Sequence, residues 1–87
     1  MTFEQVKDEI ITSLAAKRKV DVDELREELA AAGPEFPYAS VWLVSAGARA
    51  ARNLGIPIKD ARKNKKAFKS VDALARFLLD LALRKAA

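Results

Sequence analysis

Acid–base chemistry in this sequence depends on carboxylates, because the chain contains no His and no Cys. The commonest general base, the thiol nucleophile and the usual zinc ligands are therefore missing. Asp8 and Glu9 are adjacent on a predicted helix and point apart, while Asp21 and Asp23 are better explained as helix-capping and turn residues. No pair of carboxylates has a reason to be buried together. The sequence therefore predicts no catalytic residue, no metal site and no enzyme.

Positive charge is the other feature that could do chemistry, and it is concentrated late in the chain. Residues 1–35 hold five basic and nine acidic residues, whereas residues 36–87 hold eleven basic and three acidic residues. Such a difference predicts a charged partner. Residues 59–69 alone hold six basic residues and one acidic residue. This run could contact nucleic-acid phosphates, but it offers only Phe68 for stacking on bases and no amphipathic face for a membrane.

The elements that must position these side chains are predicted to be helices, and the first two lie before residue 34. Thr2 and Gln5 form a capping box ahead of the first helix, which ends at the basic cluster 17–19. Asp21 is the predicted N-cap of the second helix, which Gly33 ends. The apolar positions expected to face the core are Phe3, Val6, Ile10, Leu14, Leu25 and Leu29.

Two further helices lie in the basic part of the chain. The third has Pro37 in its first turn and ends at Gly55, and Ser70 caps the last. No segment is predicted to be a strand, so the fold class is all-α. A helical wheel gives the third helix an inner arc of Leu43, Val44, Gly47, Ala50, Ala51 and Leu54 and an outer arc of Trp42, Ser45, Arg49, Arg52 and Asn53. The buried stripe predicted for the last helix is Val71, Leu74, Phe77, Leu78 and Leu81.

The length of 87 residues allows one small domain, so we expect a single domain over residues 1–87. The N-terminus lacks the basic and apolar regions of a signal peptide, and no apolar run is long enough to span a membrane. The sequence therefore predicts a cytoplasmic protein.

The order of these hydrophobic motifs resembles the acyl carrier protein and peptidyl carrier protein family. The resemblance covers nearly the whole chain, from LREELAAAG through SVWLVSAGARAARNLGIPI to KSVDALARFLLDL. It implies an acyl-carrier-protein-like four-helix bundle with three longer helices and short connecting elements. The positions that carry it are Val41, Leu43, Val44, Leu54, Gly55, Ile56, Pro57, Ser70, Val71, Leu74, Phe77 and Leu78.

The sequence departs from this family at the prosthetic-group site. Members of the family carry a D-S-L triplet whose serine holds 4′-phosphopantetheine, and here the triplet falls on Phe36, Pro37 and Tyr38. Proline has no nucleophilic oxygen, so no cofactor is expected at this place. Ser40 is the nearest hydroxyl, and its modification stays an alternative in which the chain is a divergent but functional carrier. Otherwise Ser40 is an ordinary serine of the first helical turn.

The second departure concerns the charge of the third helix. Carrier proteins typically present an acidic helix to basic enzymes, whereas this helix carries Arg49 and Arg52 and no acid. Trp42 precedes Arg49 by seven residues and is expected on the same side. An exposed Trp beside two Arg has the composition of an interface hot spot. The alternative is that Trp42 lies over the core edge and the arginines are ordinary surface charges.

Gly47 lies inside the predicted third helix, where a glycine lowers stability by about 0.5–1 kcal/mol relative to alanine. We therefore expect a packing reason for it. Tyr38, Phe68 or Phe77 is expected to fill the space beside it.

Together these features predict a non-catalytic, carrier-like binding or scaffold module of a fatty acid, polyketide or nonribosomal peptide type of pathway. Its expected partner is a biosynthetic enzyme with an acidic patch. Two alternatives remain, which are a divergent carrier modified at Ser40 and a small basic nucleic-acid-binding protein. The predicted contact residues are Trp42, Arg49, Arg52, Lys63, Lys65 and Lys66.

Overall fold

The computed structural model describes residues 2–33, 40–56 and 68–86. Within these ranges the chain forms four α-helices and no strand, which confirms the all-α prediction. The Cα radius of gyration is 11.9 Å, close to the value of about 12 Å for a compact chain of this length. The helices are α1 (Phe3–Arg18), α2 (Val22–Ala32), α3 (Ser40–Leu54) and α4 (Val71–Ala86).

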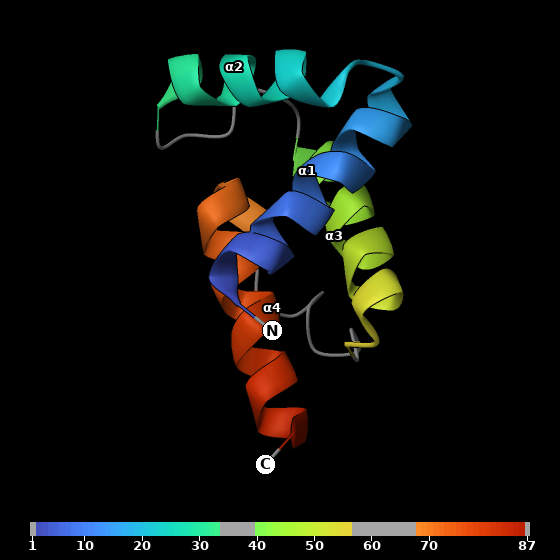
Figure 1. The fold of residues 1–87 in the computed structure, drawn as a ribbon, viewed down its shortest axis with the longest axis vertical. Coiled ribbons are helices and arrows are strands. Elements are labelled where there is room, and N and C mark those ends of the chain that lie inside the picture. Colours follow the sequence, from blue (N-terminus) through green and yellow to red (C-terminus); the bar gives the residue numbers. More distant parts are fainter. Residues whose placement is uncertain (1, 34–39, 57–67, 87) are drawn as a thin grey trace.

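Helix α1 lies at the centre of the fold, and each of the other helices packs against it (Figure 1). α3 and α4 run in the same direction, opposite to α1, while α2 crosses the end of α1 (Figure 1). α3 and α4 contact α1 far more extensively than they contact each other. Their separation is therefore set by how each packs on α1.

The core residues explain why α1 takes this central position. The predicted stripe residues Val6, Ile10 and Leu14 are fully buried, and Ile11 and Ala15 on adjoining faces are buried as well. A helix that is apolar over several faces has to be covered from several sides. The other helices complete the core with Leu25 from α2, Leu43, Ala46, Ala50 and Ala51 from α3, and Val71, Leu74, Ala75 and Leu78 from α4.

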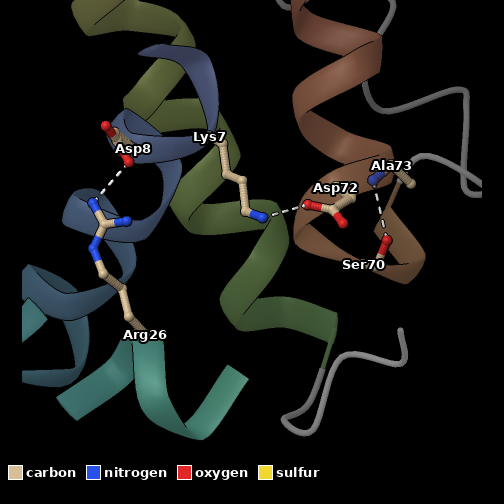
Figure 2. A network of polar contacts seen from close by, with 6 residues as sticks. All are labelled: Lys7, Asp8, Arg26, Ser70, Asp72 and Ala73. Atoms are coloured by element: carbon tan, nitrogen blue, oxygen red, sulfur yellow. Dashed lines mark hydrogen bonds and ion pairs between the residues drawn. The ribbon is translucent and has the colours of Figure 1, made fainter. Parts of the chain in front are cut away.

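One turn of α1 makes polar contacts with all three of the other helices. Lys7 Nζ lies 2.9 Å from Asp72 Oδ1 in α4, and Asp8 Oδ1 accepts a 2.7 Å hydrogen bond from Arg26 in α2 (Figure 2). Glu9 accepts a hydrogen bond from α3. Consecutive helical residues point about 100° apart, so the side chains of Lys7, Asp8 and Glu9 reach three different helices. This arrangement confirms that Asp8 and Glu9 point apart.

The starts of α1, α2 and α4 have the predicted caps. Gln5 N–H donates to Thr2 Oγ1 over 3.2 Å, and Thr2 N–H donates to Gln5 Oε1 over 2.8 Å, which completes the capping box. Asp21 accepts a 2.8 Å hydrogen bond from the backbone N–H two residues later. Ser70 Oγ accepts a 3.1 Å hydrogen bond from the N–H of Ala73 at the start of α4 (Figure 2). These side chains satisfy N–H groups that have no partner inside the helix.

Helix α3 ends in a turn that returns the chain to the core. Gly55 has a φ of 70°, in the left-handed region that glycine adopts most easily. The Ile56 N–H bonds to the Ala51 carbonyl over 2.8 Å, and the Gly55 N–H bonds to the Arg52 carbonyl over 3.2 Å. This pair of bonds is a Schellman motif. It directs the side chain of Ile56 into the buried core.

Candidate functional site

Three of the four large apolar side chains that the described residues leave exposed lie at the start of α3. Val41 is 66% exposed, and Trp42 and Val44 are each 38% exposed. Exposed apolar residues that cluster on one element mark a candidate binding surface. The first half of α3 is therefore the part of the described surface best suited to apolar contact.

The same helix carries positive charge. Arg49 and Arg52 are exposed, and α3 contains no Asp or Glu. Lys17, near the end of α1, lies beside the same surface. A surface that combines apolar side chains with cations attracts an anionic partner that also has an apolar part.

An open groove of about 580 Å³ lies between α3 and α4, and we call it the α3–α4 groove. Leu74 and Leu78 line this groove and are almost fully buried, so they form its floor together with Gly47. Its volume falls in the range of about 300–1,000 Å³ that is typical of ligand-binding clefts. The other described lining residues are Lys17, Val41, Val44, Ser45, Ala48, Arg49, Arg52, Asn53 and Phe68.

Gly47 allows α3 and α4 to approach each other at the groove floor. A Cβ added to Gly47 would lie 2.8 Å from Cδ2 of Leu74 and 3.5 Å from Cε1 of Phe68. Gly47 thus has a packing role, as we expected for a glycine inside a helix, because it leaves room for the side chain of Leu74. Phe68, one of the three aromatic residues expected there, lies beside it, while Tyr38 is outside the described residues.

Helix α1 positions both walls of the groove. Asn53 Nδ2 donates a 2.8 Å hydrogen bond to Glu9 Oε1, which joins the end of α3 to α1. Two residues earlier, Lys7 pairs with Asp72 at the start of α4 (Figure 2). Both contacts are at the surface, where such pairs contribute under about 1 kcal/mol. They orient α3 and α4, while the buried apolar residues hold them in place.

The structure brings together two of the predicted contact residues. Arg49 and Arg52 both line the groove, whereas Trp42 is exposed on the same helix but is not among the described lining residues. Ser40 is the first residue of α3, and its side chain is outside the described part. Six predicted residues also lie outside the described ranges, namely Lys63, Lys65 and Lys66 of the basic run and Phe36, Pro37 and Tyr38 of the altered triplet.

Val44 corrects the predicted core of α3. The helical wheel places it on the inner arc, yet it is 38% exposed, whereas Ala46, which the prediction omits, is fully buried. The reason is that α3 packs mainly on α1, so the edge of α3 turned towards α4 opens into the groove. Lys17 was missed for a related reason, because its place beside α3 depends on how α1 and α3 pack.

The described residues offer a surface for binding. No cluster of three or more acidic residues in the described ranges is arranged to hold a metal ion. No helix in these ranges is long and apolar enough to cross a membrane. What the arrangement provides is an apolar groove with cations along it.

Comparisons with known proteins leave the function to be argued from this site. No family model matches the chain, and no curated protein or solved structure gives a significant match. The resemblance to carrier proteins therefore rests on the order of the hydrophobic motifs in the sequence.

Proposed function

We propose that this protein is a non-catalytic binding module, a carrier-protein-like four-helix bundle that docks an acidic partner protein of a carrier-dependent biosynthetic pathway. The observation that carries the proposal is the surface of α3. There, exposed Val41 and Val44 accompany Arg49 and Arg52 on a helix without acidic residues. Apolar contact supplies affinity, and the cations select an anionic partner surface. Trp42, partly exposed on the same helix, is the residue type most often found in interface hot spots.

Support for the carrier-like scaffold comes from the last turn of α3 and the first turn of α4. The turn at Gly55 returns Ile56 to the core, and Ser70 caps α4 just before the buried Val71. These residues are among those through which the sequence resembles the carrier family. In that family the helix corresponding to α3 is acidic and meets basic enzymes. The positive surface here should repel those enzymes and suit an acidic partner.

Covalent carriage of cargo is not part of the proposed function, because Pro37 stands in the place of the modified serine. The test is intact-mass measurement after incubation with a promiscuous phosphopantetheinyl transferase and coenzyme A. We expect no mass increment. An increment that disappears in Ser40→Ala would replace the proposal with the divergent-carrier alternative. An increment that persists in Ser40→Ala would overturn it as well, since another hydroxyl would carry the group.

The docking surface is tested by reversing its charge. In Arg49→Glu/Arg52→Glu, cross-linked capture of the partner from cells that make the protein should be lost. The control Arg76→Glu/Arg84→Glu makes the same change of charge at exposed arginines of α4 that do not line the groove. The control should capture the partner as the unchanged protein does. Equal capture by the two variants would contradict the assignment of the surface to α3.

Nucleic-acid binding is the competing class of function, and it depends on the basic run 59–69. A binder of this kind has a logarithm of affinity that falls linearly with the logarithm of salt concentration. We expect neither DNA nor RNA to retain the protein at low salt. Retention with a steep salt slope would replace the docking proposal.

A further inference from the structure

We infer that the α3–α4 groove binds one acidic, amphipathic helix of the partner protein. The apolar side chains of this helix would lie on the groove floor, and its carboxylates would pair with Arg49, Arg52 and Lys17. The inference rests on the proposed function and adds the secondary structure and the residue pattern of the segment that docks. Three observations carry it, which are the charges along the groove, its apolar floor and the structure of its walls.

The charged residues among the described lining of the groove all have one sign. Lys17, Arg49 and Arg52 line it, and no Asp or Glu is among its described lining residues. The cations come from two different helices, α1 and α3, so the positive charge covers an area rather than a point. An acidic segment would gain charge-assisted contacts there, whereas a basic segment would meet like charges.

The floor of the groove, formed by Leu74, Leu78 and Gly47, is apolar, while the polar lining residues Ser45 and Asn53 belong to α3. Leu74 and Leu78 are almost fully buried beneath it, and Val44 and Phe68 flank it. Apolar side chains inserted here would be removed from water, which favours binding. The partner segment therefore needs apolar residues on the side that faces the groove.

The walls of the groove favour a helical segment over an extended one. α3 and α4 are helices, whose interior backbone groups already bond within each helix, and the described residues contain no sheet edge. An extended segment placed on them could not pair its own N–H and C=O groups with these walls, and those turned towards the floor would lose their hydrogen bonds to water. A helix satisfies these groups internally and presents residues at i, i+3, i+4 and i+7 to a groove.

The spacing of the two arginines fits such a helix. Arg49 and Arg52 are three residues apart, which gives a rise of about 4.5 Å along α3. Carboxylates at positions i and i+3 or i+4 of a helix lying along α3 have a similar separation and share one face. A pair of Glu residues bordering an apolar stripe would therefore meet both guanidinium groups.

A second copy of this chain is a poorer occupant than a foreign partner. Its α2 is acidic, but Leu25, its only fully buried residue, is already used in its own core. Glu28 of the same helix pairs with Arg18 over 3.6 Å. Leu29 is left as the main large apolar side chain that α2 could offer, and it is itself partly packed against the core.

The test uses synthetic peptides of about 18 residues, since shorter isolated helices are marginal in water. The probe has Leu at i, i+3, i+4 and i+7 with Glu beside this stripe. One control peptide replaces every Glu by Lys, and another scrambles the probe so that the stripe is lost. We expect the probe to shift the backbone amide resonances of residues 44–52 and 74–78 and to bind about tenfold or more tightly than either control. Equal binding of either control would overturn the inference.

Variants of the protein separate the contribution of the charged contacts from that of the apolar contacts. Arg49→Glu/Arg52→Glu should weaken binding of the Glu peptide and improve binding of the Lys peptide, while Arg76→Glu/Arg84→Glu should leave both unchanged. Val44→Asp should weaken the Glu peptide without unfolding the protein, because Val44 is 38% exposed. Circular dichroism checks that each variant is folded. Unchanged binding of the Glu peptide by folded Val44→Asp would show that the segment does not enter the groove.

The outcomes distinguish this inference from the proposed function. If capture of the partner requires Arg49 and Arg52 but the Glu peptide does not bind, the helix-in-groove inference fails and the docking proposal stands. If capture is independent of these arginines, the docking proposal fails too. Sedimentation velocity tests whether a second copy of this chain occupies the groove instead. A concentration-dependent dimer that Arg49→Glu/Arg52→Glu abolishes would assign the groove to a second copy and overturn the inference.

Discussion

Leu74 stands where a side chain at position 47 would have to go. A Cβ on Gly47 would lie 2.8 Å from Cδ2 of Leu74 and 3.4 Å from its Cδ1. Both terminal methyl groups of Leu74 face the glycine, so an added Cβ would require the leucine side chain to move. Leu74 is fully buried, and Phe68 approaches the same point to 3.5 Å. A side chain at position 47 would therefore displace Leu74, and Gly47 lets α3 and α4 pack without that shift.

A double-mutant cycle tests this relationship. In the unchanged background, Gly47→Ala should lower the free energy of unfolding by about 1–2 kcal/mol, because overpacking outweighs the gain in helix propensity. In a Leu74→Ala background the same change should raise it by about 0.5–1 kcal/mol, which is the propensity gain alone. Urea unfolding of the four proteins provides the numbers. If Gly47→Ala stabilises both backgrounds equally, Leu74 moves aside freely and the contact does not require glycine.

Ser13 carries a buried hydroxyl with no hydrogen-bond partner among the described residues, and the residue is 2% exposed. Burying such a group without a bond lowers stability by about 1–3 kcal/mol. Ser13→Ala should therefore raise the free energy of unfolding by about 1 kcal/mol, with part of the gain from helix propensity. Ser45→Ala, at a partly exposed position of α3, measures the propensity part alone. Equal effects of the two changes would mean that the Ser13 hydroxyl finds a partner.

The starts of α1, α2 and α4 and the ends of α2 and α3 were predictable because local interactions set them. The caps Thr2, Asp21 and Ser70 act on N–H groups two or three residues away. The ends at Gly33 and Gly55 likewise depend on the backbone conformation of single residues, which have φ of 77° and 70°. Caps and turns that involve residues so close together in the chain can be recognised from a single sequence.

The groove could not be predicted in the same way, because it depends on which helix packs on which. A helical wheel treats α3 as having one buried side and places Val44 there. In the structure α1 covers that side, and the edge towards α4 opens at Val44. The available signal was that Ile11 and Ala15 extend the apolar surface of α1 beyond one stripe. It marks α1 as central, but it does not position α4 relative to α3.

Lys19 ends α1 in the left-handed region, with φ of 57° and ψ of 44°. A residue with a Cβ is strained there by about 1–2 kcal/mol. Lys19→Gly should raise the free energy of unfolding by about 0.5 kcal/mol, because glycine relieves the strain but has greater freedom in the unfolded chain. Lys19→Ala retains the Cβ and removes the same charge, so it should give no gain. A gain in Lys19→Ala equal to that in Lys19→Gly would attribute the effect to charge and not to backbone strain.

Ser70 holds the start of α4, and thereby one wall of the α3–α4 groove, through its 3.1 Å bond from the N–H of Ala73. Ser70→Ala should lower the free energy of unfolding by about 1 kcal/mol, since a helix N-cap is lost. Ser70→Asp keeps an acceptor at the cap and should restore most of this loss. Thermal unfolding followed by circular dichroism measures all three proteins, with Ser45→Ala as the non-cap control. A loss in Ser70→Asp as large as that in Ser70→Ala would mean that the hydroxyl acts through packing and not as a cap.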